Sequence, residues 1–187
     1  MSKAPQATPY YLQMAMVEEV KHLTKDILFE TPDGSLSGLN VFPQNLPNAR
    51  RKPAEEAVRD DGYSEIEDYG EEDSFYFPWC LVKLDSGKIK EPNGRQTAIL
   101  VLVFGVYDES DGHEGYQKLL TMYQKIVERF AKTPVLSDQF RLEGEMNWAI
   151  QDEDEDSASG IGTSPYQFGA LSMTFSMPGY RREDPFA

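Results

Sequence analysis

The sequence predicts an α+β fold: a four-stranded, mostly antiparallel sheet with two amphipathic helices on one face, plus long acidic loops. Two segments, residues 10–29 and 115–132, repeat apolar residues with helical spacing. Four further segments are continuously apolar or alternate apolar with polar residues, as strands do. These strand candidates are residues 76–84, 95–107, 140–150 and 166–177. A chain of 187 residues suits a single domain, residues 1–187.

The two predicted helices each present one apolar face. In residues 10–29 that face consists of Leu12, Met16, Val20, Leu23 and Ile27. In residues 115–132 it consists of Tyr116, Leu119, Leu120, Tyr123, Ile126, Val127 and Phe130. Pro9 precedes the first helix and Pro134 follows the second, and proline is typical of both positions. We expect both apolar faces to pack on the sheet.

Residues 31–75 have four prolines and no apolar period, which predicts a long loop or insertion. Within this stretch, residues 36–43 can supply a short extended piece. Residues 48–73 are acidic and poor in apolar side chains, so they have little surface to bury on folding. We therefore expect 48–73 to be mobile and dispensable for folding.

The strand candidates form two hairpins. Residues 76–84 and 95–107 are joined by a turn region that begins at Asp85. The second strand of this hairpin is apolar on both faces over residues 98–104, which predicts a central strand covered on both sides. The other hairpin joins 140–150, which has one apolar face, to 166–177. The apolar phase of 166–177 changes at Gly169 and Ala170, where a β-bulge would produce it.

The net charge of −14 comes from two stretches. Residues 55–73 hold ten acidic residues and one base, and residues 152–156 hold five acidic residues and no base. The rest of the chain is neutral, so it offers no Lys/Arg-rich face for binding nucleic acid. The N-terminus has no apolar signal segment, and the longest apolar run, 98–104, is too short to span a bilayer as a helix. No membrane association and no cofactor is predicted.

Two acidic stretches are candidate metal or acid/base sites. Asp108, Asp111, His113 and Glu114 lie between a strand and a helix, where capping and the helix dipole explain them without a ligand. Asp152, Asp154 and Asp156 occupy the first ligand positions of a calcium loop. That loop then requires Gly and Glu where the chain has Ser157 and Thr163. A solvated hairpin tip is favoured there, and weak divalent-cation binding is the alternative.

Nucleophilic catalysis has little support. Cys80 lies in an apolar strand, which predicts a buried and unreactive thiol. His22 and His113 are the only histidines, and neither has a Ser or Cys context. The aromatic run at 74–79 is expected to enter the core as an edge strand that tolerates Pro78. We therefore predict a protein that is not an enzyme.

The C-terminus offers a candidate subunit interface. Paired charges and one aromatic residue follow the last strand: Arg181, Arg182, Glu183, Asp184 and Phe186. Such a segment is either a free tail or an anchor that docks on a neighbouring subunit. The residue pattern leaves both interpretations open.

Three phrases and the C-terminus carry a resemblance to a known family. The phrases are FYFPWCLVKLDSGK (75–88), AILVLVFGVYDES (98–110) and GYQKLLTMYQKIVERFAKTPVL (115–136), and the C-terminal phrase is RREDPF (181–186). Over residues 10–30 and 75–187 the chain resembles the tail terminator and tail-completion proteins of long-tailed, siphovirus-type bacteriophages and prophages. The acidic stretch 48–73 has no counterpart in that pattern.

The resemblance implies an α+β structural protein of the virion tail or neck, assembled in the bacterial host cytoplasm. Such proteins form homo-oligomeric rings, usually hexamers, that cap the tail tube and join it to the head. The implied partners are further copies of the chain, the tail tube protein and a head–tail connector or neck protein. DNA would only pass through the lumen, past acidic loops that repel phosphates. The alternatives are another neck or connector protein, or a divalent-cation-binding protein or enzyme using residues 152–156.

Overall fold

The computed structural model describes residues 7–47, 76–91, 94–109, 115–150 and 165–179. Within these residues the chain is α+β, with a six-stranded sheet and a separate two-stranded sheet. The helices are α1 (Pro9–Thr24) and α2 (Gly115–Lys132). The strands are β1 (Phe29–Glu30), β2 (Leu36–Ser37), β3 (Asn40–Pro43), β4 (Trp79–Ile89), β5 (Gln96–Tyr107), β6 (Val135–Leu136), β7 (Phe140–Ile150) and β8 (Tyr166–Met177).

The predicted four-stranded sheet is wrong. The large sheet has the order β3-β4-β5-β8-β7-β6, so one short strand is added at each edge of the four expected strands. β3 pairs with β4 in parallel, and all other pairs are antiparallel. β3 lies within residues 36–43, where a short extended piece was expected inside the predicted loop, but its pairing with the sheet was not predicted; β6 is only two residues long. Strands this short carry no readable periodicity, because only their long-range pairing defines them.

Only β2 of the two-stranded sheet lies in the stretch predicted as a loop, because β1 begins at Phe29, the predicted end of the first helix. β1 and β2 are antiparallel and are joined by a turn around Asp33. The hydroxyl of Thr31 and the backbone N–H of Ser35 both donate to the Asp33 carboxylate, the latter at 3.0 Å. These hydrogen bonds lower the pKa of Asp33 to about 2. The acidic stretch 48–73 lies outside the described residues.

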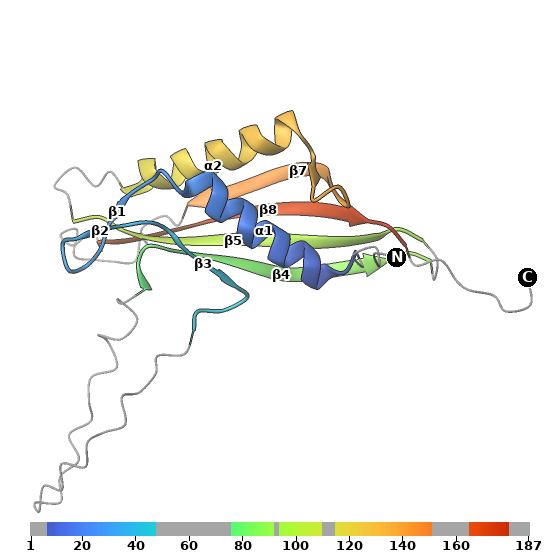
Figure 1. Ribbon diagram of the computed structural model, residues 1–187, viewed down its shortest axis with the longest axis horizontal. Coiled ribbons are helices and arrows are strands. Elements are labelled where there is room, and N and C mark those ends of the chain that lie inside the picture. Colours follow the sequence, from blue (N-terminus) through green and yellow to red (C-terminus); the bar gives the residue numbers. More distant parts are fainter. Residues whose placement is uncertain (1–6, 48–75, 92–93, 110–114, 151–164, 180–187) are drawn as a thin grey trace, which may run out of the picture.

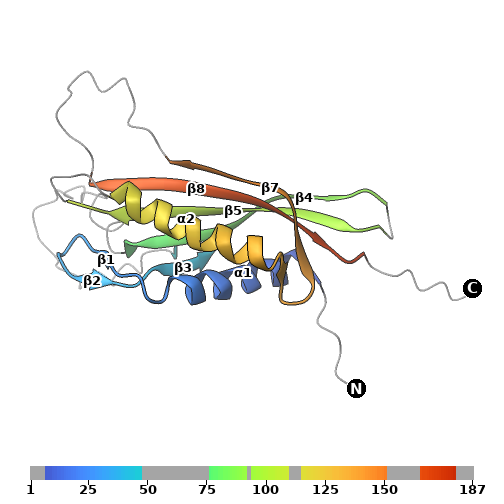
Figure 2. The same ribbon diagram turned by 90° about the horizontal axis from the view of Figure 1, so that it is seen from above.

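Both helices lie on the same face of the large sheet (Figures 1 and 2). α1 packs on β3 and β4, and α2 packs on β5, β7 and β8. The bounds predicted for α2 are confirmed. The predicted end of α1 at residue 29 is wrong, because the helix ends at Thr24 and Phe29 begins β1 with its side chain fully buried.

The predicted packing face of α2 is broader than the core contact. Leu119, Tyr123, Ile126 and Phe130 are buried as predicted, and Met122 joins them. The other three predicted residues are exposed or half-buried along one side of the helix: Tyr116, Leu120 and Val127. α2 therefore carries more apolar surface than the sheet covers.

The β4–β5 hairpin is longer than predicted. Residues 85–88, expected to begin a turn, belong to β4 and pair with β5 beyond a bulge between Leu84 and Ser86. This far end of the hairpin is exposed, so it lacks the apolar residues that reveal a strand in sequence.

The bulge predicted in β8 is also wrong. β8 pairs with β5 without interruption from Gln96↔Met177 to Tyr107↔Tyr166. The irregularity lies in β7 instead, between Glu143 and Met146, where Gly144 has a φ of +72°. A left-handed backbone of this kind favours glycine. The apolar phase of β8 changes because its two ends contribute to clusters on opposite faces of the sheet.

The main core fills the space between the helices and the sheet. Its strand residues alternate along β5 and β8, and they include Leu100, Leu102, Phe104, Leu171 and Phe175, all fully buried. A second, aromatic cluster lies on the opposite face at one end of the sheet. It consists of buried Phe77, Trp79 and Tyr107 with Phe42, Tyr166 and Phe168 around them.

Candidate functional site

Of the four candidate residues in the acidic corner after β5, only Asp108 lies within the described residues. Asp108 is 3% exposed, and its backbone N–H donates to the Pro165 carbonyl oxygen at 2.8 Å. A Cβ added at Gly115 would lie 2.9 Å from the Asp108 Cβ, so α2 begins in close contact with the end of β5. Asp108 is thus part of the joint between these two elements. Asp111, His113 and Glu114 lie outside the described residues.

The other predicted charged sites also lie outside the described residues. These are the possible divalent site at Asp152, Asp154 and Asp156, and the possible interface at Arg181, Arg182, Glu183, Asp184 and Phe186. Across the described ranges, no three His, Cys, Asp or Glu side chains come together in a way that could hold a metal ion.

The candidate nucleophile is buried as predicted. Cys80 on β4 is fully buried on the helix side of the sheet, and burial raises the pKa of its thiol well above the ordinary range. His22 is exposed near the end of α1.

The aromatic run around Trp79 is placed differently from the prediction. Phe77 and Trp79 are buried, but in the cluster on the face opposite the helices. Trp79 is not on an edge, because it pairs with Asn40 of β3 and Gly105 of β5. Gly105 is required for this arrangement, since an added Cβ would lie 2.5 Å from the Trp79 ring.

The face of β5 opposite the helices is apolar and only half-buried. Ile99, Val101 and Val103 point to this face, in register with Thr174, Ser172 and Ala170 of β8, respectively. No helix or strand in the described parts of the chain packs over it (Figure 2). We call this row of residues on β5 and β8 the open sheet face. Its β5 row is apolar, and its β8 row holds Ala170 with the polar Ser172 and Thr174.

The negative charge is attached to one end of the sheet. Leu46 and Tyr76 both pack on the aromatic cluster, Asp108 bonds to Pro165, and Ile150 pairs with Gly169. Residues 48–75, 110–114 and 151–164 are all joined to the chain at this end. By sequence they hold seventeen acidic residues and four Lys/Arg, a net charge of −13 out of −14. By sequence, nearly all of the net negative charge therefore belongs to segments whose flanking residues lie at this end of the sheet.

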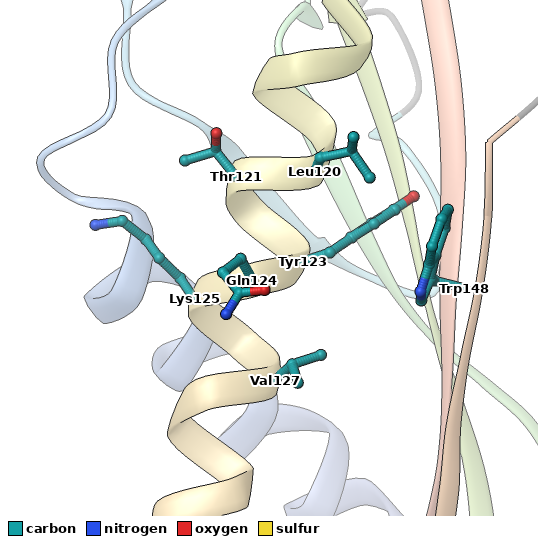
Figure 3. A pocket seen from close by; sticks show the side chains of 7 residues that line it. All are labelled: Leu120, Thr121, Tyr123, Gln124, Lys125, Val127 and Trp148. Carbon is teal, nitrogen blue, oxygen red and sulfur yellow. The ribbon is translucent and has the colours of Figure 1, made fainter.

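An open groove of about 550 Å³ lies between α2 and β7 (Figure 3). It is lined by Leu120, Thr121, Tyr123, Gln124, Lys125, Val127 and Trp148. Tyr123 reaches across from α2, with its ring centroid 6.1 Å from that of Trp148, and its hydroxyl donates to the Ala149 carbonyl oxygen at 3.2 Å. Burial raises the pKa of Tyr123, so this hydroxyl stays protonated. Trp148 is 56% exposed, so its ring forms an open wall of the groove.

The strand beside the groove also has an unpaired edge. β6 pairs with β7 only at Arg141 and Phe140, and the N–H of Leu142 donates to the Pro134 carbonyl oxygen at 2.8 Å. In the part of the chain that the structure describes, no strand pairs with this edge over residues 143–150. Unpaired backbone groups of an edge strand are a template for a further strand. We call this segment the β7 edge.

The sequence interpretation missed the groove and the β7 edge. The available signals were the excess apolar width of α2 and a tryptophan in a strand whose other face is charged. Both features were assigned to the core, because periodicity reports the direction of a side chain and not what lies in front of it.

No protein-family model matches the chain, and a search of curated proteins finds no significant match. None of the helices in the described ranges has the length and apolarity needed to cross a membrane.

Proposed function

We propose that this chain is a non-enzymatic virion assembly protein of the tail terminator kind. In this proposal it forms a homo-oligomeric ring that caps a phage tail tube and joins it to the head. The observation that carries the proposal is the open sheet face, an apolar surface on the central strand of the sheet. A subunit buried between neighbours needs such a surface, whereas an isolated domain is better served by a polar one.

The uneven charge supports the same proposal. The described body of the protein has a net charge of −2, while the three segments that join it at one end of the sheet carry −13 by sequence. In a ring, these ends would gather negative charge from every subunit around the axis or on one rim. Such a surface repels DNA phosphates, so DNA would pass without binding. The near-neutral remainder is free of this repulsion and suits contact between subunits.

Two surfaces of different chemistry fit a ring better than a twofold dimer. A ring requires that one patch of a subunit meets a different patch of the next. The open sheet face and the groove lie on opposite sides of the sheet, so both can be used at once (Figure 2). The partners beyond the ring would be the tail tube protein and a head–tail connector or neck protein.

The test measures assembly of the purified full-length chain. Native mass spectrometry and negative-stain micrographs should give closed rings, either of the chain alone or with purified tail tubes. Val101→Glu places a charge in the open sheet face at a half-buried position and should abolish rings while leaving the monomer folded. Gln117→Glu adds the same charge at an exposed position on α2 and serves as the matched control.

The outcomes separate the candidate functions. Rings that bind tail tubes support a terminator, and rings that bind only head or neck proteins support a connector. A full-length chain that neither forms rings nor binds tail tubes contradicts the proposal. If the Val101→Glu variant forms as many rings as the Gln117→Glu control, the open sheet face is not the interface.

A further inference from the structure

The outer edge of β4 is covered by β3 along only part of its length. β3 runs parallel to β4 and ends where Pro43 lies opposite Val82. β4 continues to Ile89, and in the described ranges no further strand pairs with it on this side. An uncovered strand edge offers its backbone groups to any other strand. The groups that occupy this edge after Val82 therefore decide whether the sheet can grow there.

The side chain of Gln44 takes the place of the next residue of β3. The backbone N–H of Gln44 still donates to the Val82 carbonyl oxygen at 3.0 Å, which continues the parallel ladder. The chain then turns away, because Gln44 has a φ of +65° and the N–H of Asn45 donates to the Pro43 carbonyl oxygen at 2.8 Å. The N–H of Leu84 donates to Gln44 Oε1 at 3.0 Å, in place of a backbone carbonyl oxygen of β3. Gln44 Nε2 in turn donates to the Leu84 carbonyl oxygen at 3.4 Å, so one side-chain amide closes the edge at Leu84.

A second glutamine holds this amide from the helix layer. α1 packs on β3 and β4 (Figure 1), and Gln13 lies on its buried side, 6% exposed. Gln13 Nε2 donates to Gln44 Oε1 at 2.9 Å and to the Val82 carbonyl oxygen at 2.7 Å. A buried amide without partners is costly, so Gln13 and Gln44 hold each other in place.

We propose that Gln13 and Gln44 form a latch that closes the β4 edge to a further strand. Past the latch, a bulge after Leu84 and the exposed Lys88 discourage pairing in other ways. On the other side of the sheet, the described strands leave the β7 edge open. Sheets with two open edges can join edge to edge without limit, since such a contact between different patches need not close. The latch prevents this growth whether or not the chain forms rings.

The backbone of Gln44 supports a role for its side chain. A positive φ is strained for residues other than glycine, so a turn that needed only this conformation would favour glycine. Ser137 and Asp138 also have positive φ values, of 48° and 56°, but their side chains are exposed. Gln44 differs because its side chain bonds to β4 and to α1. The strain is therefore offset by what the amide does.

Replacing Gln44 with glycine separates a latch from a turn. If Gln44 served only the turn, glycine would relieve the strain and raise Tm. For a latch, losing the amide outweighs that relief, and we expect Tm to fall by at least about 3 °C. Asp138→Gly is the matched control, with the same backbone region and an exposed side chain, and its Tm should stay the same or rise. A Gln44→Gly protein as stable as the wild type, or more stable, would overturn the proposal.

Hydrogen exchange of the Leu84 amide, followed by NMR, reports on the latch directly. In Gln44→Ala this N–H loses its acceptor and should exchange at least about tenfold faster, while the amide of Leu102 on β5 keeps its rate. Gln13→Leu should speed Leu84 exchange about threefold or more, and should add nothing in the Gln44→Ala background. Gln117→Leu, at an exposed position of α2, is the control for Gln13→Leu. An unchanged Leu84 rate in Gln44→Ala, or equal effects of Gln13→Leu in both backgrounds, would refute the latch.

Sedimentation velocity then tests the consequence for assembly. Gln44→Ala, still folded by circular dichroism, should form species larger than those of the wild type, and their size should grow with protein concentration. Adding Ser86→Lys at the exposed part of β4 should remove them, because an edge lysine discourages strand pairing. Faster Leu84 exchange without larger species would show that the amide pair does not guard the edge. Larger species that persist with Ser86→Lys would place the new contact elsewhere and also contradict the proposal.

Discussion

Replacing Gly169 with alanine would place a methyl group against the tyrosine that spans the groove. Gly169 lies on β8 between Phe104 of β5 and Ile150 of β7, on the side that faces α2. An added Cβ would lie 2.1 Å from the Tyr123 hydroxyl oxygen and 3.1 Å from the Ala149 carbonyl oxygen. Since a carbon and an oxygen in contact need more than 3 Å, Tyr123 must move.

The cost follows from what holds Tyr123 in place. Its ring is 3% exposed and packs 5.5 Å from the Phe104 centroid and 6.1 Å from that of Trp148. Forcing a methyl group into such a site costs about 1–3 kcal/mol, and losing the hydroxyl's bond to Ala149 costs about 1 kcal/mol more. Alanine restricts the unfolded chain and offsets about 0.4–1 kcal/mol. We expect a net loss of about 2–3 kcal/mol, which lowers Tm by about 4–12 °C.

Urea unfolding followed by tryptophan fluorescence measures this loss, and Tyr123→Phe is the matched background. Without the hydroxyl, the nearest ring atom to the new methyl group is Cζ, at 3.3 Å. Gly169→Ala should therefore cost less than about 1 kcal/mol in that background, with a coupling free energy of at least about 1 kcal/mol. An equal loss in both backgrounds would refute the reasoning, because the hydroxyl would not be the obstacle.

Three further predictions concern the core, the turn at Asp33 and the thiol. Phe130→Ala should cost about 3–5 kcal/mol in the same unfolding assay, since Phe130 is 1% exposed and its ring centroid lies 5.4 Å from that of Phe175; a loss below about 1 kcal/mol would mean that the face is misassigned. NMR titration should give Asp33 a pKa of about 2. Because this pKa is lower than in the unfolded chain, the Asp33 carboxylate stabilises the β1–β2 turn fully above about pH 4, and this stabilisation is lost as the pH falls toward 2. An Asp33→Asn variant should lack this pH dependence. Cys80 should resist a soluble thiol reagent at pH 8 until urea unfolds the protein, because the thiol is fully buried and its pKa is raised; rapid labelling of the native protein would contradict its placement.

The long elements were predictable because their patterns are local. Four turns of apolar spacing define α2, and its bounds at 115 and 132 were predicted correctly. The alternation in β7 correctly placed Phe140, Leu142, Met146 and Trp148 on one face, since the irregularity at Gly144 inserts two residues and keeps the phase. The burial of Cys80 followed from its apolar strand in the same way.

The errors share a cause, which is that the deciding partner is distant in the chain. β3 exists because Asn40 reaches Pro78, whose carbonyl oxygen accepts both the backbone N–H and the Nδ2 group of Asn40. β8 runs straight through Gly169 because Tyr166 and Phe168 have their own aromatic cluster on the other face. Sequence patterning identified these residues as apolar and could not reveal that there were two clusters.

The sequence by itself determined the class of fold, the faces of the long helices and strands, and the concentration of charge in a few segments. These depend on side chains within a few residues of each other. Only the tertiary structure decided the sheet order, the common end of the sheet at which the acidic segments join the described residues, and the exposure at Val101 and Trp148. The physical reason is that the exposure of a side chain depends on which elements pack against it. Strand pairing between residues far apart in the sequence decides which elements those are.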